Sequence, residues 1–310
     1  MMRDLSCFGE TSVQIADAAS SSSSSSSAVA GGGGGRGQGG AAAQSLVTCL
    51  YQARLSGRPC VVSVTWSRGG LVGQAGLGVA VDDGASGERL CRTNVKPCLF
   101  SKRKGSKSLD VAGSGDGKVY VYWDLSGAKF GPGPEPLEGF YVAVVCDLEM
   151  LLLLGDMGKE AYRKTGAGRP GNDTLLVARR EHIVGKKVYS AKAQFCDNGR
   201  CHDIAIECDT TGQKDPCLEI RIDTRPVMRV KRLAWKFRGN QTILVDGLPV
   251  EVFWDVHGWL FSSTTSSAVF MFQTCQALEK SMSWMYSQIF REPQLQGHGF
   301  SLLLHAWKVE

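Results

Sequence analysis

The chain has 310 residues, 43% of them hydrophobic, so it is long enough to build one large domain or two ordinary ones around a core. Its 35 Lys and Arg against 30 Asp and Glu give a net charge of +5, which permits an anionic partner without requiring one. No apolar run is long enough to span a bilayer, and the opening Met-Met-Arg-Asp lacks the apolar stretch of a secretory signal. We therefore expect an intracellular protein, cytoplasmic or nuclear, with no transmembrane segment and with most of its eleven cysteines reduced.

Residues 1–44 are low in complexity, with a serine run at Ser20–Ser27 and a glycine run at Gly31–Gly35. Such a stretch cannot bury enough apolar surface to offset the entropy lost on ordering. The composition predicts a disordered Ser/Gly-rich tail.

From Ser45 onward, short apolar runs rich in Val, Ile, Tyr and Trp alternate with Gly, Asp, Asn and Pro, as in KVYVYWDL and FYVAVVCDL. This texture is typical of strands separated by turns. A sustained apolar period of 3.6 residues is nearly absent. We expect an all-β protein with little helix.

An internal repeat organises these runs. Val119–Phe130 and Val250–Phe261 are identical at six of twelve positions, and further segments match in the same order at similar offsets. The repeat predicts two related antiparallel β lobes, barrel-like or sandwich-like, that arose by duplication. Their expected bounds are 45–155 and 174–310, with a linker at 156–173.

Residues 276–298 have no counterpart in the first lobe and fall where the first lobe has a tight turn. We expect an inserted loop. A mobile insertion and a partner-binding helix are both open, since one helical face would carry Leu278, Met282, Met285 and Ile289.

The repeated Trp-Asp pair has a structural interpretation. Alternation along a strand points Trp123 and Trp254 into a core, while Asp124 and Asp255 at the strand ends accept backbone hydrogen bonds in the following turn. A catalytic Asp is the alternative, but duplicated turn chemistry is the simpler account. The same alternation predicts burial of four tryptophans: Trp66, Trp123, Trp235 and Trp254.

Several motifs in order resemble the plant domain-of-unknown-function family numbered 868. They include MRDLSCFGE, FSKRKGSKSLDV, WDLSGAKFGPGPEPLEGFYVAVV, HDIAIECDT, VKRLAWKFRGNQTI and VEVFWDVHGW. The resemblance covers nearly the whole chain except the Ser/Gly tail and 276–298. It implies a plant protein, and it carries no activity or functional residue over to this sequence.

Motifs for catalysis, nucleotide binding and metal binding are missing from the sequence. The glycine-rich Gly113–Gly117 leads into a strand, whereas a phosphate cradle needs a helix behind it. Cys196 and Cys201-His202 resemble a zinc fragment, but no second ligand pair follows. Asn198-Gly199 instead favours a two-residue hairpin turn that sets the two cysteines opposite each other as thiols. We predict no catalytic residues, cofactor or metal.

Basic residues cluster at corresponding places in the two lobes. LAWKF, read as a strand, has a core face and a basic face. The candidate binding residues are Lys102, Arg103, Lys104 and Lys107 in the first lobe and Arg232, Lys236 and Arg238 in the second. They suit phosphates of nucleic acid or anionic lipid, and the alternative is a solvated strand edge that charge protects from aggregation.

The sequence therefore favours a non-catalytic binding or scaffold protein, whose partner is a protein or a small apolar ligand held inside a lobe. A nucleic-acid or anionic-lipid binder is the alternative. An enzyme is the third and disfavoured reading.

Overall fold

The computed structural model describes residues 43–69, 74–95, 103–113, 117–168, 174–196, 199–209, 216–262, 267–274 and 299–308. These residues form a mostly β fold built from several antiparallel sheets, which confirms the predicted class. The predicted tail, except its last two residues, and the predicted loop at 276–298 lie outside the described residues.

The first half is a sandwich of two four-stranded meanders. One meander is β1 (Ala43–Leu55), β2 (Arg58–Gly69), β3 (Gln74–Asp83) and β4 (Arg89–Val95). The other is β5 (Lys104–Asp110), β6 (Lys118–Asp124), β9 (Tyr141–Cys146) and β10 (Glu149–Leu154). A small hairpin of β7 (Lys129–Phe130) and β8 (Pro136–Glu138) joins β6 to β9, and α1 (Gly158–Thr165) follows β10.

The second half repeats this two-meander plan after β11 (Leu175–Gly185). Its first meander is β12 (Val188–Ala193), β13 (His202–Asp209), β14 (Cys217–Ile222) and β15 (Arg225–Val230). Its second is β16 (Arg238–Val245), β17 (Leu248–Asp255), β18 (Ser267–Thr274) and β19 (Ser301–Lys308), with α2 (His257–Phe261) between β17 and β18.

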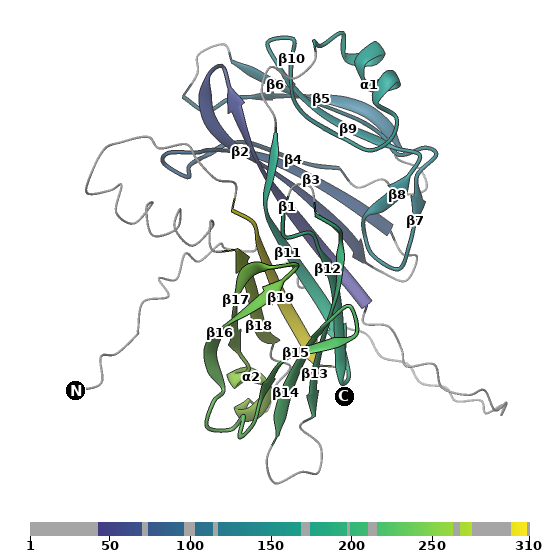
Figure 1. Cartoon of the computed structure of the whole chain (residues 1–310). Helices are drawn as coiled ribbons and strands as arrows, with labels where there is room; N and C mark the ends of the chain where they lie inside the picture. Colours follow the sequence, from purple (N-terminus) through teal and green to yellow (C-terminus); the bar gives the residue numbers. More distant parts are fainter. Residues whose placement is uncertain are drawn as a thin grey trace, which may run out of the picture. The chain divides into compact units, whose positions relative to one another are not determined.

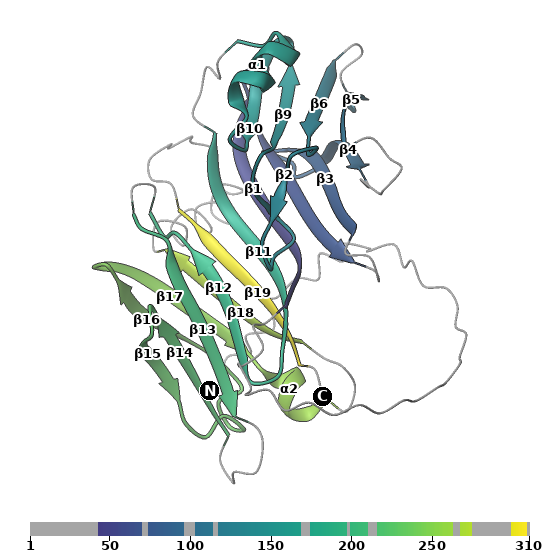
Figure 2. The same cartoon turned by 90° about the vertical axis from the view of Figure 1, so that its right-hand side faces the viewer.

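One continuous sheet joins the two halves. Its nine strands run in the order β16-β17-β18-β19-β11-β1-β2-β3-β4, with β1 and β11 side by side near the middle (Figures 1 and 2). The β1–β11 pair is antiparallel, with Thr48 opposite Arg180, whereas β11 and β19 run parallel, with His182 opposite His305. A remaining four-stranded sheet packs on each half, β10-β9-β6-β5 on the first and β12-β13-β14-β15 on the second.

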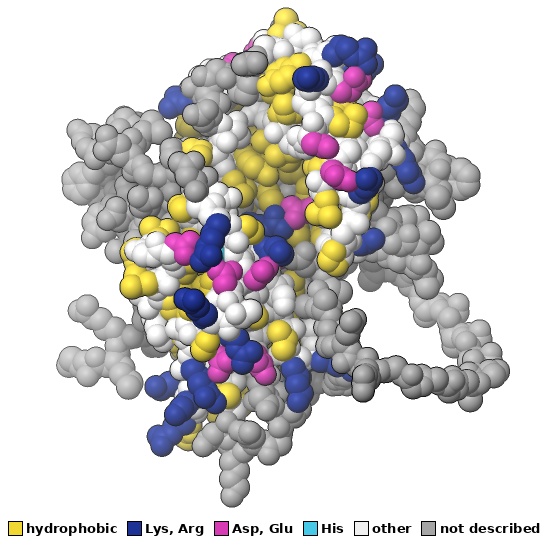
Figure 3. All heavy atoms as spheres, turned by 45° about the vertical axis from the view of Figure 1, so that its right-hand side comes forward, with side chains coloured by type: hydrophobic (Ala, Val, Ile, Leu, Met, Phe, Trp, Pro, Cys, Tyr) yellow, Lys and Arg dark blue, Asp and Glu magenta, His cyan; other side chains and the backbone are white. Residues whose placement is uncertain are grey.

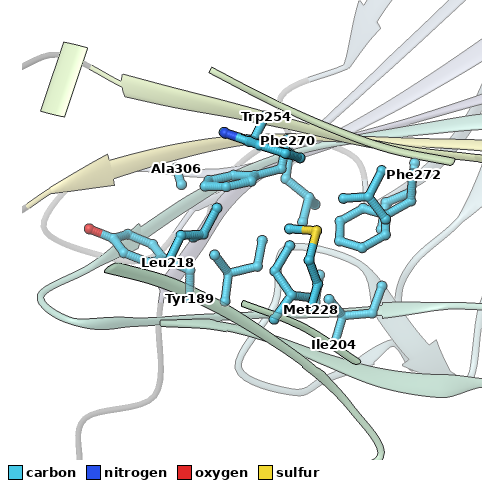
Figure 4. Close-up of a cluster of buried hydrophobic side chains, with 14 of the residues drawn as sticks. Tyr189, Ile204, Leu218, Met228, Trp254, Phe270, Phe272 and Ala306 are labelled. Carbon is cyan, nitrogen blue, oxygen red and sulfur yellow. The ribbon is translucent and has the colours of Figure 1, made fainter. Parts of the chain in front are cut away.

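Side chains fill the space between the facing sheets. In β17 the alternate residues Val250, Val252 and Trp254 are buried, as a period of two requires. They meet buried residues of the opposite sheet, including Tyr189 and Leu218 (Figure 4). The second lobe therefore has a packed centre, in contrast to the ligand-holding interior that the sequence left open.

The predicted burial of tryptophan is confirmed at three of the four positions and wrong at the fourth. Trp66, Trp123 and Trp254 are buried, but Trp235 is 85% exposed. Trp235 is exposed because residues 233–235 form a turn, so the strand alternation expected for LAWKF does not apply there.

The two halves share a hairpin in detail. In the first half Gly105 of β5 lies opposite Trp123 of β6, and in the second half Gly239 of β16 lies opposite Trp254 of β17. In each hairpin the indole covers the glycine, because a Cβ built there would meet the indole Cζ2, at 3.0 Å from Gly105 and 2.5 Å from Gly239. The halves differ at their first two strands. In the first half β1 pairs with β2, whereas in the second half β11 and β12 belong to different sheets. The duplication stays a prediction.

The repeated aspartates hold turns, as the sequence predicted. Asp124 Oδ1 accepts a hydrogen bond from the Ser126 amide at 2.9 Å, and Asp255 Oδ1 accepts one from the His257 amide at 3.0 Å. Both contacts are the local hydrogen bonds of an Asx turn, so each carboxylate stabilises the turn that follows its strand.

Candidate functional site: a basic turn with an exposed tryptophan

The described residues among the predicted cations lie on or just before the edge strands of two different sheets. Lys102 lies outside the described residues; Arg103, Lys104 and Lys107 are exposed at β5, and Arg232, Lys236 and Arg238 are exposed at the start of β16 or just before it. Both β5 and β16 are edge strands, so the structure does not bring the two clusters together in one sheet. Lys104 pairs with Asp124 between β5 and β6, and Arg238 pairs with Asp255 between β16 and β17. Lys104 and Arg238 therefore occupy equivalent positions in the two hairpins.

The second cluster is carried by a tight turn. The amides of Trp235 and Lys236 donate to the Arg232 carbonyl at 2.9 and 3.1 Å. Arg232 has a φ of 55°, which only a minority of non-glycine residues adopt. The turn carries the Trp235 side chain into solvent.

Contacts with the core brace this turn. Leu233 is fully buried, and its amide donates to the Pro216 carbonyl at 3.0 Å. On the other side of the turn, the buried indole of Trp254 donates from Nε1 to the Lys236 carbonyl at 2.9 Å. The exposed indole therefore rises from a backbone that is held at both ends.

Three further aromatic rings lie next to the turn. Phe237 packs edge-on against His257 and Phe261, with ring centroids 5.4 and 5.5 Å away, and Phe261 is 54% exposed. The guanidinium of Arg238 lies over the Phe237 ring, 5.6 Å from its centroid. Aromatic and cationic groups thus share one small surface.

The turn has an excess of positive charge. Arg238 pairs with Asp255 at 2.7 Å, whereas Lys231, Arg232 and Lys236 make no ion pair with any acid of the described residues. Figure 3 shows Lys and Arg side chains gathered at the end of the second lobe where Figure 1 places α2. We call Lys231, Arg232, Trp235, Lys236 and Arg238 the basic–aromatic turn.

A buried histidine between two aspartates forms a second polar cluster. His202 is 3% exposed; its Nδ1 lies 2.8 Å from Asp223 Oδ2 and its Nε2 lies 3.1 Å from Asp246 Oδ2. Arg200 bonds Asp246 and reaches Asp223 at 3.3 Å. The hydrogen bond from His202 lowers the pKa of Asp223, and that from Arg200 lowers the pKa of Asp246.

These four residues line part of a cavity of about 300 Å³. Asp223 comes from the β14–β15 turn and Asp246 from the β16–β17 turn, so the cluster ties the two sheets of the second lobe together. Both imidazole nitrogens lie within hydrogen-bond distance of a carboxylate from one of these two turns. We call Arg200, His202, Asp223 and Asp246 the clamp, because they join the two turns.

The predicted register of Cys196 and Cys201 is wrong. The ladder pairs Ala193 with His202, and the Gly199 amide donates to the Cys196 carbonyl at 3.0 Å. The bond joins residue 199 to residue 196, where the prediction joined 200 to 197, and the ladder is two positions out of the predicted register, so Cys196 and Cys201 are not a cross-strand pair. Both are exposed and free, while His202 points into the protein. Among the described residues, no group of three His, Cys, Asp or Glu side chains is placed to hold a metal ion.

A third cluster lies where the two halves meet. Arg179 of β11 pairs with Glu181 and with Glu135 of the segment between β7 and β8, and its Nη1 lies 3.3 Å from Cys49 Sγ. Burial raises the pKa of the Cys49 thiol to about 11, so it is a poor nucleophile near neutrality. The cluster holds the segment between β7 and β8 against the nine-stranded sheet.

The fold and these clusters define a β-sandwich protein with an exposed basic–aromatic turn and a packed core in its second lobe. Residues 42–308 match the model of the family described as plant protein of unknown function (DUF868), so the chain belongs to that family. The comparisons with curated proteins and with solved structures gave no match. Within the described residues, no helix has the length and apolar character needed to cross a membrane.

Sequence reasoning identified Arg232, Lys236 and Arg238 of the basic–aromatic turn but missed Lys231 and the exposure of Trp235. Residues 233–237 alternate apolar and polar as a strand would, so nothing local marked Trp235 as exposed. It also missed the clamp, because Asp223 and Asp246 lie far from His202 in the chain.

Proposed function

We propose that this protein is a non-catalytic binding protein that recognises a phosphate-bearing polyanion through the basic–aromatic turn. The observation that carries the proposal is the side chain of Trp235, which is 85% exposed on a braced turn. Beside it lie three cations that make no ion pair with any acid of the described residues. Clustered Lys and Arg side chains bind phosphate groups well. An exposed tryptophan adds contact area for a ligand, whereas charges that only keep a surface soluble need no such side chain beside them.

The alternative for the basic residues is protection of strand edges against aggregation. It accounts well for Lys104, Lys107 and Arg238, which lie on the edge strands β5 and β16. It does not account for Arg232 and Lys236, which lie in a turn outside any strand, nor for an exposed tryptophan among them.

Salt-dependent retention on heparin tests the proposal. We expect the variant Lys231→Glu/Arg232→Glu/Lys236→Glu to elute at clearly lower salt than the wild type, because each lost phosphate contact reduces counterion release. A matched variant reverses three exposed cations of the first half, Arg54, Arg58 and Lys118, and has the same net charge. Equal elution of the two variants would refute the turn as the binding site.

An intracellular location, cytoplasmic or nuclear, belongs to this proposal. The exposed Cys196 and Cys201 and the buried Cys60 and Cys91 are free thiols, as is usual in a reducing compartment. Fractionation of cells that express the tagged full chain tests this location.

A further inference from the structure

We propose that the basic–aromatic turn docks the protein peripherally on an anionic lipid surface, with the Trp235 indole inserted at the level of the headgroups. This inference rests on the proposed polyanion binding and names the source of the phosphate. The turn supplies the two parts that such docking needs, an exposed amphipathic side chain and exposed cations close to it in the chain.

The exposure of Trp235 favours lipid over nucleic acid. A stacked base covers one face of an aromatic ring, so a stacking platform can rest its other face on the protein. Trp235 is 85% exposed, so its indole stands clear of the protein on nearly all sides. Insertion into a bilayer interface removes both faces and the edge of the ring from water, while the indole N–H stays near polar headgroups.

The neighbouring rings support the same choice. Phe237, His257 and Phe261 pack on one another with centroids 5.1 to 5.5 Å apart, so their faces and edges are partly used within the protein. They offer no row of free faces for successive bases. Phe261, 54% exposed, adds apolar surface beside the inserted indole instead.

The cations lie within four residues of the indole along the chain. Lys231, Arg232 and Lys236 are exposed and make no ion pair with acids of the described residues, so they keep their charge for phosphate groups. A Lys or Arg held near an anionic membrane strengthens binding by roughly fivefold. Three such cations together strengthen membrane binding by a factor on the order of a hundred.

The bracing of the turn lowers the cost of docking. The buried Leu233 and the bond from Trp254 Nε1 to the Lys236 carbonyl fix the backbone before any ligand arrives. A group that is already ordered loses less entropy on binding than one on a flexible loop.

The test is co-sedimentation of the full chain with vesicles. One set of vesicles is equimolar phosphatidylcholine and phosphatidylserine, and the other is phosphatidylcholine alone. We expect binding to the anionic vesicles only, with a loss of about tenfold in Trp235→Ala. Lys231→Glu/Arg232→Glu/Lys236→Glu should lose at least about a hundredfold, because it removes three attractive charges and adds three repulsive ones. The matched first-half variant of Arg54, Arg58 and Lys118 should bind as the wild type does.

Fluorescence separates insertion from simple charge attraction. Brominated lipids in the anionic vesicles should quench part of the wild-type tryptophan emission, and this part should be missing in Trp235→Phe. Circular dichroism of each variant checks that the fold is intact.

Two results would overturn the inference. One is absence of binding to the anionic vesicles while heparin retention still depends on the turn; a Trp235-dependent complex with a single-stranded oligonucleotide would then name nucleic acid as the ligand. The other is vesicle binding that Trp235→Ala leaves unchanged. Loss of both heparin and vesicle binding in the wild type would refute the proposed function as well.

Discussion

Gly239 is a position where a single added methyl group should destabilise the second lobe. A Cβ at residue 239 would lie 2.5 Å from Cζ2, 2.9 Å from Cη2 and 3.1 Å from Cε2 of Trp254. The indole has little freedom to move away, because it is buried and its Nε1 donates to the Lys236 carbonyl. Gly239→Ala must therefore displace the ring or the strand.

The expected cost follows from these contacts. Overpacking of a core costs about 1–3 kcal/mol, and a weakened indole hydrogen bond adds about 1 kcal/mol. Alanine also has fewer conformations than glycine in the unfolded chain, which offsets up to about 1 kcal/mol of this destabilisation. We expect a net loss of about 1–3 kcal/mol, or a midpoint lowered by roughly 2–6 °C.

Thermal and urea unfolding measure this loss, with Gly158→Ala in α1 as control. A Cβ at Gly158 meets only Leu153 at an ordinary 3.6 Å, so that variant should be as stable as the wild type or slightly more. Adding Trp254→Phe to Gly239→Ala removes the clashing ring atoms, and the double variant should lose less than the sum of the two single changes. Strict additivity, or equal stability of Gly239→Ala and Gly158→Ala, would refute the reasoning.

Three further expectations concern stability and thiol chemistry. Trp123→Ala should cost about 3–5 kcal/mol in urea unfolding, because it empties a buried site in the first lobe; an unchanged midpoint would contradict its place in the core. The pKa of Asp223 is lowered from 3.8 by His202, so its ionised form stabilises the fold above that value and the stabilisation is lost as the pH falls below it; Asp223→Asn should flatten the acid limb of the stability curve. Maleimide at mildly alkaline pH should label the exposed Cys196 and Cys201 in the native protein but spare Cys60, whose pKa burial raises to about 11; rapid labelling of Cys60 would show that its strand opens.

The sequence alone determined the local features of the fold. A period of two in runs such as Val119–Asp124 buries one face of a strand whatever lies opposite, so the strands and the inward Trp123 and Trp254 were predictable. The aspartate turns were predictable for a similar reason, because an Asx turn involves only residues two apart.

Only the tertiary structure decided the features that depend on distant partners. LAWKF has the pattern of a strand, but its backbone turns because Leu233 is drawn into the core and the Trp254 indole takes the Lys236 carbonyl as its acceptor. The joining of both halves in one sheet is likewise set by the long-range pairing of β1 with β11. The exposure of Trp235, on which the proposed site rests, is thus a consequence of contacts that no local pattern encodes.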